Sequence, residues 1–105
     1  MNSVILLTVD SLRADRATQE CLPESLDVLN NDYVEFNNAY SHGVATPFAF
    51  PGIVASSHPI GNGNLPDGVP TLAEGIPGSS AGYANNGHLR PERGYDRGFT
   101  HFEEN

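Results

Sequence analysis

The sequence predicts an α/β fold with a mainly parallel sheet, short helices and long loops. Residues 4–9 form a continuous apolar run that stops at a charged residue, which is typical of a buried strand of a parallel sheet. Leu22, Leu26 and Leu29 recur at helical spacing. The 11 glycines and 8 prolines among 105 residues indicate a large share of loop. A chain of this length has room for one domain, which we expect over residues 1–105.

The N-terminal third is expected to contain a strand over residues 3–9, then a loop and a helix. The helix extends over about residues 23–32, because Pro23 suits its first position and an Asn-Asn-Asp run marks its end. Residues 33–36 alternate in polarity and include β-forming types, so they form a second strand or an extended segment.

The rest of the chain is expected to be mostly loop. A short helix is predicted over residues 50–57, beginning at Pro51. Residues 58–70 are rich in Gly, Pro and Asn and form a loop. One or two helical turns follow over residues 71–76, and little regular structure is expected after residue 87.

The charge of the chain limits its partners. Thirteen carboxylates stand against five arginines and no lysine, so the net charge is −8. We expect no nucleic-acid partner, because affinity for phosphates comes from Lys and Arg. An acidic surface without lysine favours a salt-rich cytoplasm, where self-repulsion is screened. The apolar run 4–9 is far shorter than the about 20 residues of a membrane span. No basic segment precedes it, so we expect no signal peptide, no membrane association and a cytoplasmic location.

Asp10 follows the predicted strand directly. The carboxyl ends of strands form the rim at which open α/β sheets bind ligands, so Asp10 is a candidate metal ligand. The position alone is equally typical of a solvated turn or helix-capping aspartate. A cation bound here would reverse the local negative charge, which otherwise repels an anionic ester.

Four segments in order resemble the sulfatase family of the alkaline phosphatase superfamily, and are closest to haloarchaeal sulfatase-like proteins. Residues 4–16 resemble the opening strand and metal-binding loop, 23–41 a helix and strand, 45–57 the nucleophile segment, and 93–102 a glycine–aromatic segment. The resemblance implies part of an alkaline-phosphatase-like sandwich. Because the family's catalytic domain is several times longer, we expect an incomplete N-terminal domain that is inactive alone.

The resemblance implies Thr46 as the nucleophile. Aligning the segment on residues 53–56 places Thr46 at the nucleophile position, whereas aligning it on Pro47 places Ala45 there, which has no nucleophilic group. Relatives that transfer phosphoglycerol use an unmodified threonine that also binds the metal. A helix after Thr46 would present N–H groups to the anionic oxygens of an ester. The alternative is that Thr46 is a helix cap or turn residue.

A divalent cation (Ca²⁺, Mg²⁺ or Mn²⁺) suits oxygen ligands such as Asp10 and Thr46. Their oxygens are expected to converge to within about 5 Å, because each ligand lies 2.0–2.6 Å from one ion. The implied substrate is a small anionic ester of sulfate or phosphate, split by metal-dependent hydrolysis.

The chain departs from the family pattern at several positions. Phe50 stands where the family has an arginine, and Ser11 where many members have a second aspartate. The family's distal pair of metal ligands has no counterpart in these residues, so a second chain that carries such a pair is one candidate partner. The competing hypothesis is therefore a non-catalytic remnant or partner subunit with an incomplete metal site.

The histidines show no metal-binding spacing. His42 lies four residues before Thr46 and is expected to be a turn residue. His58, His88 and His101 are too scattered for a zinc motif.

Overall fold

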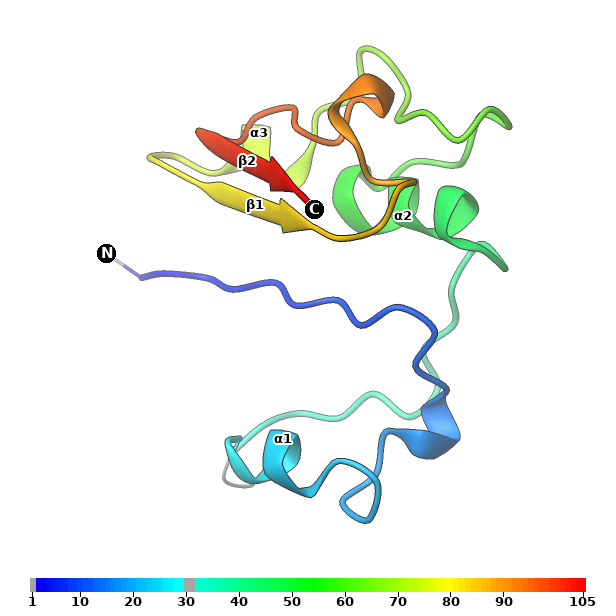
Figure 1. Ribbon diagram of the computed structural model, residues 1–105, viewed down its shortest axis with the longest axis vertical. Helices are drawn as coiled ribbons and strands as arrows, with labels where there is room; N and C mark the ends of the chain where they lie inside the picture. Colours follow the sequence, from blue (N-terminus) through cyan, green and yellow to red (C-terminus); the bar gives the residue numbers. More distant parts are fainter. Residues whose placement is uncertain (1, 30–31) are drawn as a thin grey trace. The chain divides into compact units, whose positions relative to one another are not determined.

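The computed structural model describes residues 2–29 and 32–105 (Figure 1). It divides into two compact units, Met1–Ala39 and Tyr40–Asn105, and each is described by itself. The coarse α/β class is confirmed, because the chain forms helices and a small parallel sheet. The single domain over residues 1–105 stays a prediction.

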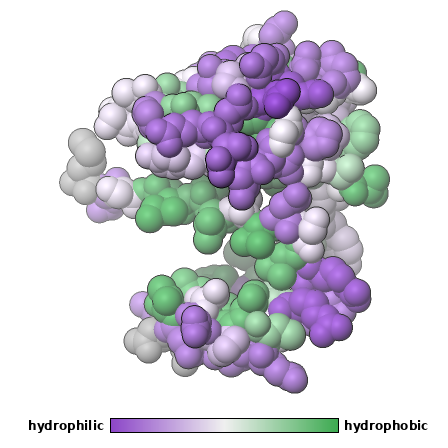
Figure 2. All heavy atoms as spheres, viewed as in Figure 1, coloured by the Kyte–Doolittle hydropathy of each residue, from purple (hydrophilic) through white to green (hydrophobic). Residues whose placement is uncertain are grey.

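The strand predicted over residues 3–9 is absent from the structure. Residues 2–9 have no regular secondary structure, and Val4, Ile5 and Leu7 are 84%, 90% and 80% exposed. Such exposed apolar side chains appear in green on the surface shown in Figure 2. A strand requires a hydrogen-bonded neighbour, and the one strand pairing among the described residues involves other segments. The apolar pattern of this segment is therefore typical of a buried strand, but its side chains are exposed in this structure.

Two short helical segments follow in the first unit. The 3₁₀ helix η1 spans Ala14–Arg16, beside an ion pair of 2.7 Å between Arg13 and Asp15. Helix α1 spans Pro23–Asp27, with Pro23 at its start as expected. It is shorter than the predicted helix 23–32, and part of the predicted end, residues 30–31, lies outside the described residues. A helix of so few residues gains little from its own hydrogen bonds. Residues 34–36 have no regular structure and are exposed, so they form no second strand.

Helix α2 opens the second unit and spans Thr46–Ala55. The predicted start at Pro51 was wrong, because Pro47 occupies the first turn and Pro51 lies inside the helix. An internal proline removes one backbone hydrogen bond. Here burial compensates for this loss, since Pro51 is almost completely excluded from solvent. The helix ends at Ser56, whose left-handed backbone (φ 49°) turns the chain away.

The sheet consists of β1, Ala81–Ala84, and β2, His101–Glu104, which pair in parallel with Ala81 opposite His101. Neither strand was predicted. The intervening connection contains the 3₁₀ helix η2, Pro91–Arg93. Gly82 allows β1 to lie close to the ring of Phe102, because a Cβ at this position would collide with that ring.

The loop over residues 58–70 and the helical turn after it were predicted correctly. Helix α3 spans Leu72–Gly75 and begins with a capping box, in which Thr71 accepts from the Glu74 N–H and Glu74 accepts from the Thr71 N–H. The Thr71 hydroxyl also donates to the Arg97 carbonyl at 2.9 Å. The Arg97 guanidinium donates to two loop carbonyls, at 3.0 and 3.1 Å. These bonds fasten the loop and α3 to the connection between the strands.

A small apolar core holds the second unit together. Its members come from α2, the loop, the β1–β2 connection and β2: Ala55, Leu65 and Tyr95 are buried, with Phe50, Val54, Val69, Leu89 and Phe102 packed around them. The longest helix, α2, has 10 residues, and no helix in the described part of the chain is long and apolar enough to cross a membrane.

Gly98 is expected to be the glycine least tolerant of substitution. Its φ is +87°, and a Cβ would collide with the backbone of α3 at Ala73 and Glu74. Gly78 has a similar φ of +94° but open space around it. Gly78→Ala should cost about 1 kcal/mol of unfolding free energy from backbone strain alone, and Gly98→Ala about 3 kcal/mol. Urea unfolding of the full chain would measure both, and equal losses would contradict the proposed close packing at Gly98.

Candidate functional site

Thr46 lies at the first position of α2. The preceding Ala45 is the N-cap, with an extended backbone (φ −147°, ψ 161°) and no side-chain oxygen to cap the helix. Thr46 is therefore not the N-cap, which lies one position earlier, at Ala45. The Thr46 side chain is not required for capping and can take part in other interactions.

The side chain of Asn86 reaches Thr46. Asn86 lies two positions after Ala84, the last residue of β1, and its Nδ2 donates to Thr46 Oγ1 at 3.5 Å. The residues are 40 positions apart in the chain. The carboxyl end of a parallel strand and the start of a helix thus meet at one point, which is the usual place for ligand-binding groups in α/β folds.

The orientation of the Asn86 amide follows from a local turn. Its Oδ1 accepts from the backbone N–H of His88 at 2.9 Å, and its carbonyl accepts from the N–H of Leu89 at 2.9 Å. A backbone N–H can only donate, so the amide atom facing His88 is the oxygen. The amino group is then the end that faces Thr46. Asn86 was not predicted from the sequence, although the pair Asn86-Gly87 is a turn signal.

A donor aimed at Thr46 Oγ1 favours the ionised form of the hydroxyl, because hydrogen bonds to a charged form stabilise it. The amide cannot accept the hydroxyl proton through its amino group, so Asn86 is no general base in this orientation. The amino group of Asn86 thus lies where a hydrogen bond from it would stabilise negative charge on Oγ1.

The backbone at the start of α2 offers less to an anion than expected. Pro47 has no N–H, and the N–H groups of Phe48 and Ala49 both donate to the Ala45 carbonyl, at 3.0 and 2.9 Å. Pro47, Phe48 and Ala49 therefore offer no N–H group to an ester oxygen, and the expectation that this helix end presents N–H groups to an ester stays a prediction for the residues before Pro47.

Asp10 lies in the first unit, at a turn, with an exposed side chain. The next residue, Ser11, has a left-handed backbone with φ 58°. Thr46 belongs to the second unit. The convergence of the oxygens of Asp10 and Thr46 around one cation stays a prediction.

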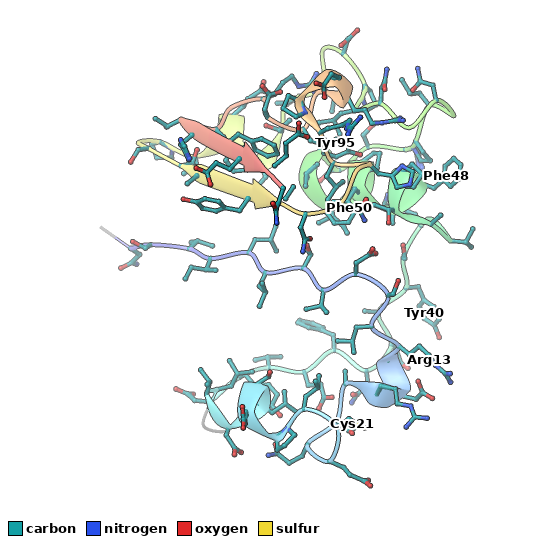
Figure 3. The ribbon with its side chains drawn as sticks, in the orientation of Figure 1. Arg13, Cys21, Tyr40, Phe48, Phe50 and Tyr95 are labelled. Carbon is teal, nitrogen blue, oxygen red and sulfur yellow. The ribbon has the colours of Figure 1, made fainter. Side chains whose placement is uncertain are left out.

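Phe50 occupies a structural position. Its ring packs edge-to-face on Tyr95, with centroids 6.4 Å apart and planes at 81° (Figure 3). Burial raises the pKa of the Tyr95 phenol above its usual value, and the nearby Arg93 charge partly opposes this. An arginine at position 50 would place a charge in this core, so packing favours an aromatic residue here.

His42 lies at a bend, as expected, and its ring lies against Gly52 rather than at Thr46. Gly52 is six residues beyond Thr46 in α2, a rise of about 9 Å. His42 is thus displaced along the helix from the Thr46 hydroxyl.

The second unit also contains a pocket of about 250 Å³, lined in part by Asn62, Leu65, Arg93 and Arg97. Both guanidinium groups are used within the fold, because Arg93 donates to the Asn62 carbonyl at 3.0 Å and Arg97 holds the loop. This pocket shares no lining residue with the Thr46–Asn86 contact.

Within residues 2–29 and 32–105, no group of three or more His, Cys, Asp or Glu side chains is arranged to hold a metal ion. Comparison of the chain with protein-family models, with curated proteins and with solved structures found no match.

Asn86→Ala should lower the unfolding free energy by about 1 kcal/mol, because it removes both the turn acceptor and the donor to Thr46. Asn86→Asp should lower it less, since the acceptor for the His88 N–H remains. The neighbouring exposed Asn85 provides the control, and Asn85→Ala should change stability by less than about 0.5 kcal/mol. Urea unfolding followed by circular dichroism measures all three. Equal effects of Asn85→Ala and Asn86→Ala would contradict the role given to Asn86.

Proposed function

We propose that this chain carries the nucleophile-bearing N-terminal part of a sulfatase-like, metal-dependent hydrolase of sulfate or phosphate esters. In this proposal Thr46 is the nucleophile and a metal ligand, Asp10 is a second metal ligand, and Asn86 supports the charge on Thr46 Oγ1. The finer fold is part of the same proposal, with the parallel pair β1–β2 as part of an alkaline-phosphatase-like sandwich.

The observation that carries the proposal is the contact of 3.5 Å between Asn86 Nδ2 and Thr46 Oγ1. It links the resemblance in residues 45–57 to a local arrangement that suits nucleophilic chemistry. A threonine with a purely structural role at the start of a helix needs no amide donor delivered from the end of a distant strand.

The donor types of Asp10 and Thr46 fit a hard cation such as Ca²⁺, Mg²⁺ or Mn²⁺, which prefers oxygen ligands. When bound, such a cation lowers the pKa of the hydroxyl and neutralises ester oxygens. In this mechanism Thr46 Oγ1 would lose its proton to water and attack the sulfur or phosphorus atom. The ester oxygen would leave with the electron pair of the broken bond and take up a proton from water. A second water molecule would later cleave the bond to Thr46, which releases sulfate or phosphate and restores the hydroxyl. Asn86 holds Oγ1 in position and donates to it throughout.

A second candidate function, a non-catalytic remnant or partner subunit, is favoured by one observation. Phe50 contributes its ring to the core at the position where the resemblance places a catalytic arginine. A residue that packs in the core at this position cannot serve catalysis. This is compatible with a protein that binds a ligand but does not convert it. The two candidates differ in whether Asp10 and Thr46 share a cation.

The proposal can be tested by calorimetric titration of the full chain with Ca²⁺ or Mn²⁺. Potassium chloride in the buffer screens the nonspecific attraction of cations to the acidic chain. Asp10→Asn and Thr46→Val should each weaken binding by about tenfold, which corresponds to 1.4 kcal/mol. Thr46→Ser should restore most of the affinity, because the hydroxyl is retained.

Asp15→Asn is the matched control, since Asp15 lies in the same exposed segment but pairs with Arg13 at 2.7 Å. Its affinity should equal that of the unaltered chain. Cation binding that is absent, or unchanged in both Asp10→Asn and Thr46→Val, would contradict the shared site and favour the remnant.

A further inference from the structure

Two histidines that are distant in the chain come together beside α2. His42 precedes this helix and His58 follows it, and their ring centroids lie 5.7 Å apart with planes at 46°. Both side chains are exposed. The remaining histidines, His88 and His101, take no part in this pair, which is a ring contact rather than a sequence motif.

Local structure sets the position of each ring. On one side, the Ser41 hydroxyl donates to the Gly43 carbonyl at 2.8 Å and accepts from the Gly43 N–H at 3.2 Å, which fixes the bend at His42. On the other side, the N–H groups of Ser56 and Ser57 donate to carbonyls in the last turn of α2, at 3.2 and 3.1 Å. This C-terminal turn leads the chain back along the helix to His58.

Gly52 leaves space for the His42 ring. A Cβ at this position would collide with Nε2, Cε1 and Cδ2 of His42. Glycine is unfavourable inside a helix by about 1 kcal/mol relative to alanine. The helix therefore contains a destabilising residue at the one place where the His42 ring requires room.

We propose that His42 and His58 form a binding site for a late first-row divalent transition metal ion such as Zn²⁺. Two imidazoles that bind one tetrahedral ion through nitrogens about 2.0–2.1 Å away have ring centroids about 5 Å apart, close to the observed separation. Because His42 Nε2 faces Gly52, the nitrogen of this ring that would bind the ion is Nδ1. Imidazole is a preferred ligand of Zn²⁺ and Cu²⁺ and a poor one for Ca²⁺ and Mg²⁺. Water completes the coordination, and the net charge of −8 attracts cations to the surface. This site is separate from the hard-cation site proposed at Asp10 and Thr46.

Zinc titration of the full chain, followed by calorimetry and by NMR of the imidazole rings, tests the proposal. We expect one Zn²⁺ per chain, shifts at His42 and His58 without shifts at His88 and His101, and no competition from Ca²⁺. His42→Gln and His58→Gln should each weaken zinc binding by about tenfold or more, whereas His88→Gln and His101→Gln should leave it unchanged.

Gly52→Ala provides a variant that removes no ligand. Because the exposed His42 ring can swing away from the new methyl group, the chain should remain folded, and zinc binding should weaken. Cys21→Ser excludes the exposed cysteine as a ligand, and Thr46→Val and Asp10→Asn separate this site from the proposed hydrolase site; all three should keep full zinc affinity. Three results would overturn the proposal. His88→Gln could weaken zinc affinity as much as His42→Gln does, zinc could shift the NMR signals of His88 or His101, or both His42→Gln and His58→Gln could retain full zinc affinity.

Discussion

The packing of α2 against the connection between β1 and β2 is the contact on which the candidate site depends. Phe50 of α2 lies edge-to-face on Tyr95 of the connection, within the core of the second unit. Burial of aromatic side chains contributes about 1.5–3 kcal/mol each, whereas one hydrogen bond contributes about 1 kcal/mol. The contact from Asn86 to Thr46 cannot by itself hold two segments together. The aromatic packing fixes the helix, and Thr46 then meets the amide that follows β1.

The fold was predictable where a local rule decides the structure. The helical turns over residues 71–76 and the Gly- and Pro-rich loop over residues 58–70 depend on local sequence, and both predictions were confirmed. The strands were missed because β1 and β2 contain no β-branched residue, and their pairing depends on contacts between segments 20 positions apart. The strand predicted over residues 3–9 failed for the opposite reason, since the local pattern is strong but no partner strand pairs with it among the described residues.

The candidate site was only partly predictable. Thr46 came from the resemblance, and its place at the start of α2 agrees with that expectation. Asn86 and the pairing of His42 with His58 could not be predicted, because each requires knowledge of which distant segments pack on α2. Phe50 shows how packing and chemistry compete, since one residue cannot supply both an aromatic ring to the core and a cation to a substrate. Because the core holds the Phe50 ring, the proposed hydrolysis would need its positive charge from a bound metal or from another residue.

The proposed hydrolase site requires that Asp10 and Thr46 bind the same cation. Paramagnetic broadening by Mn²⁺, measured by NMR on the full chain, reports this directly, because broadening falls steeply with distance from the bound ion. Substoichiometric Mn²⁺ should broaden the amide signals of Asp10, Thr46 and Asn86 together, at one common affinity, and leave Asp15 less affected. Broadening of Asp10 without Thr46, or of the two at different affinities, would contradict it.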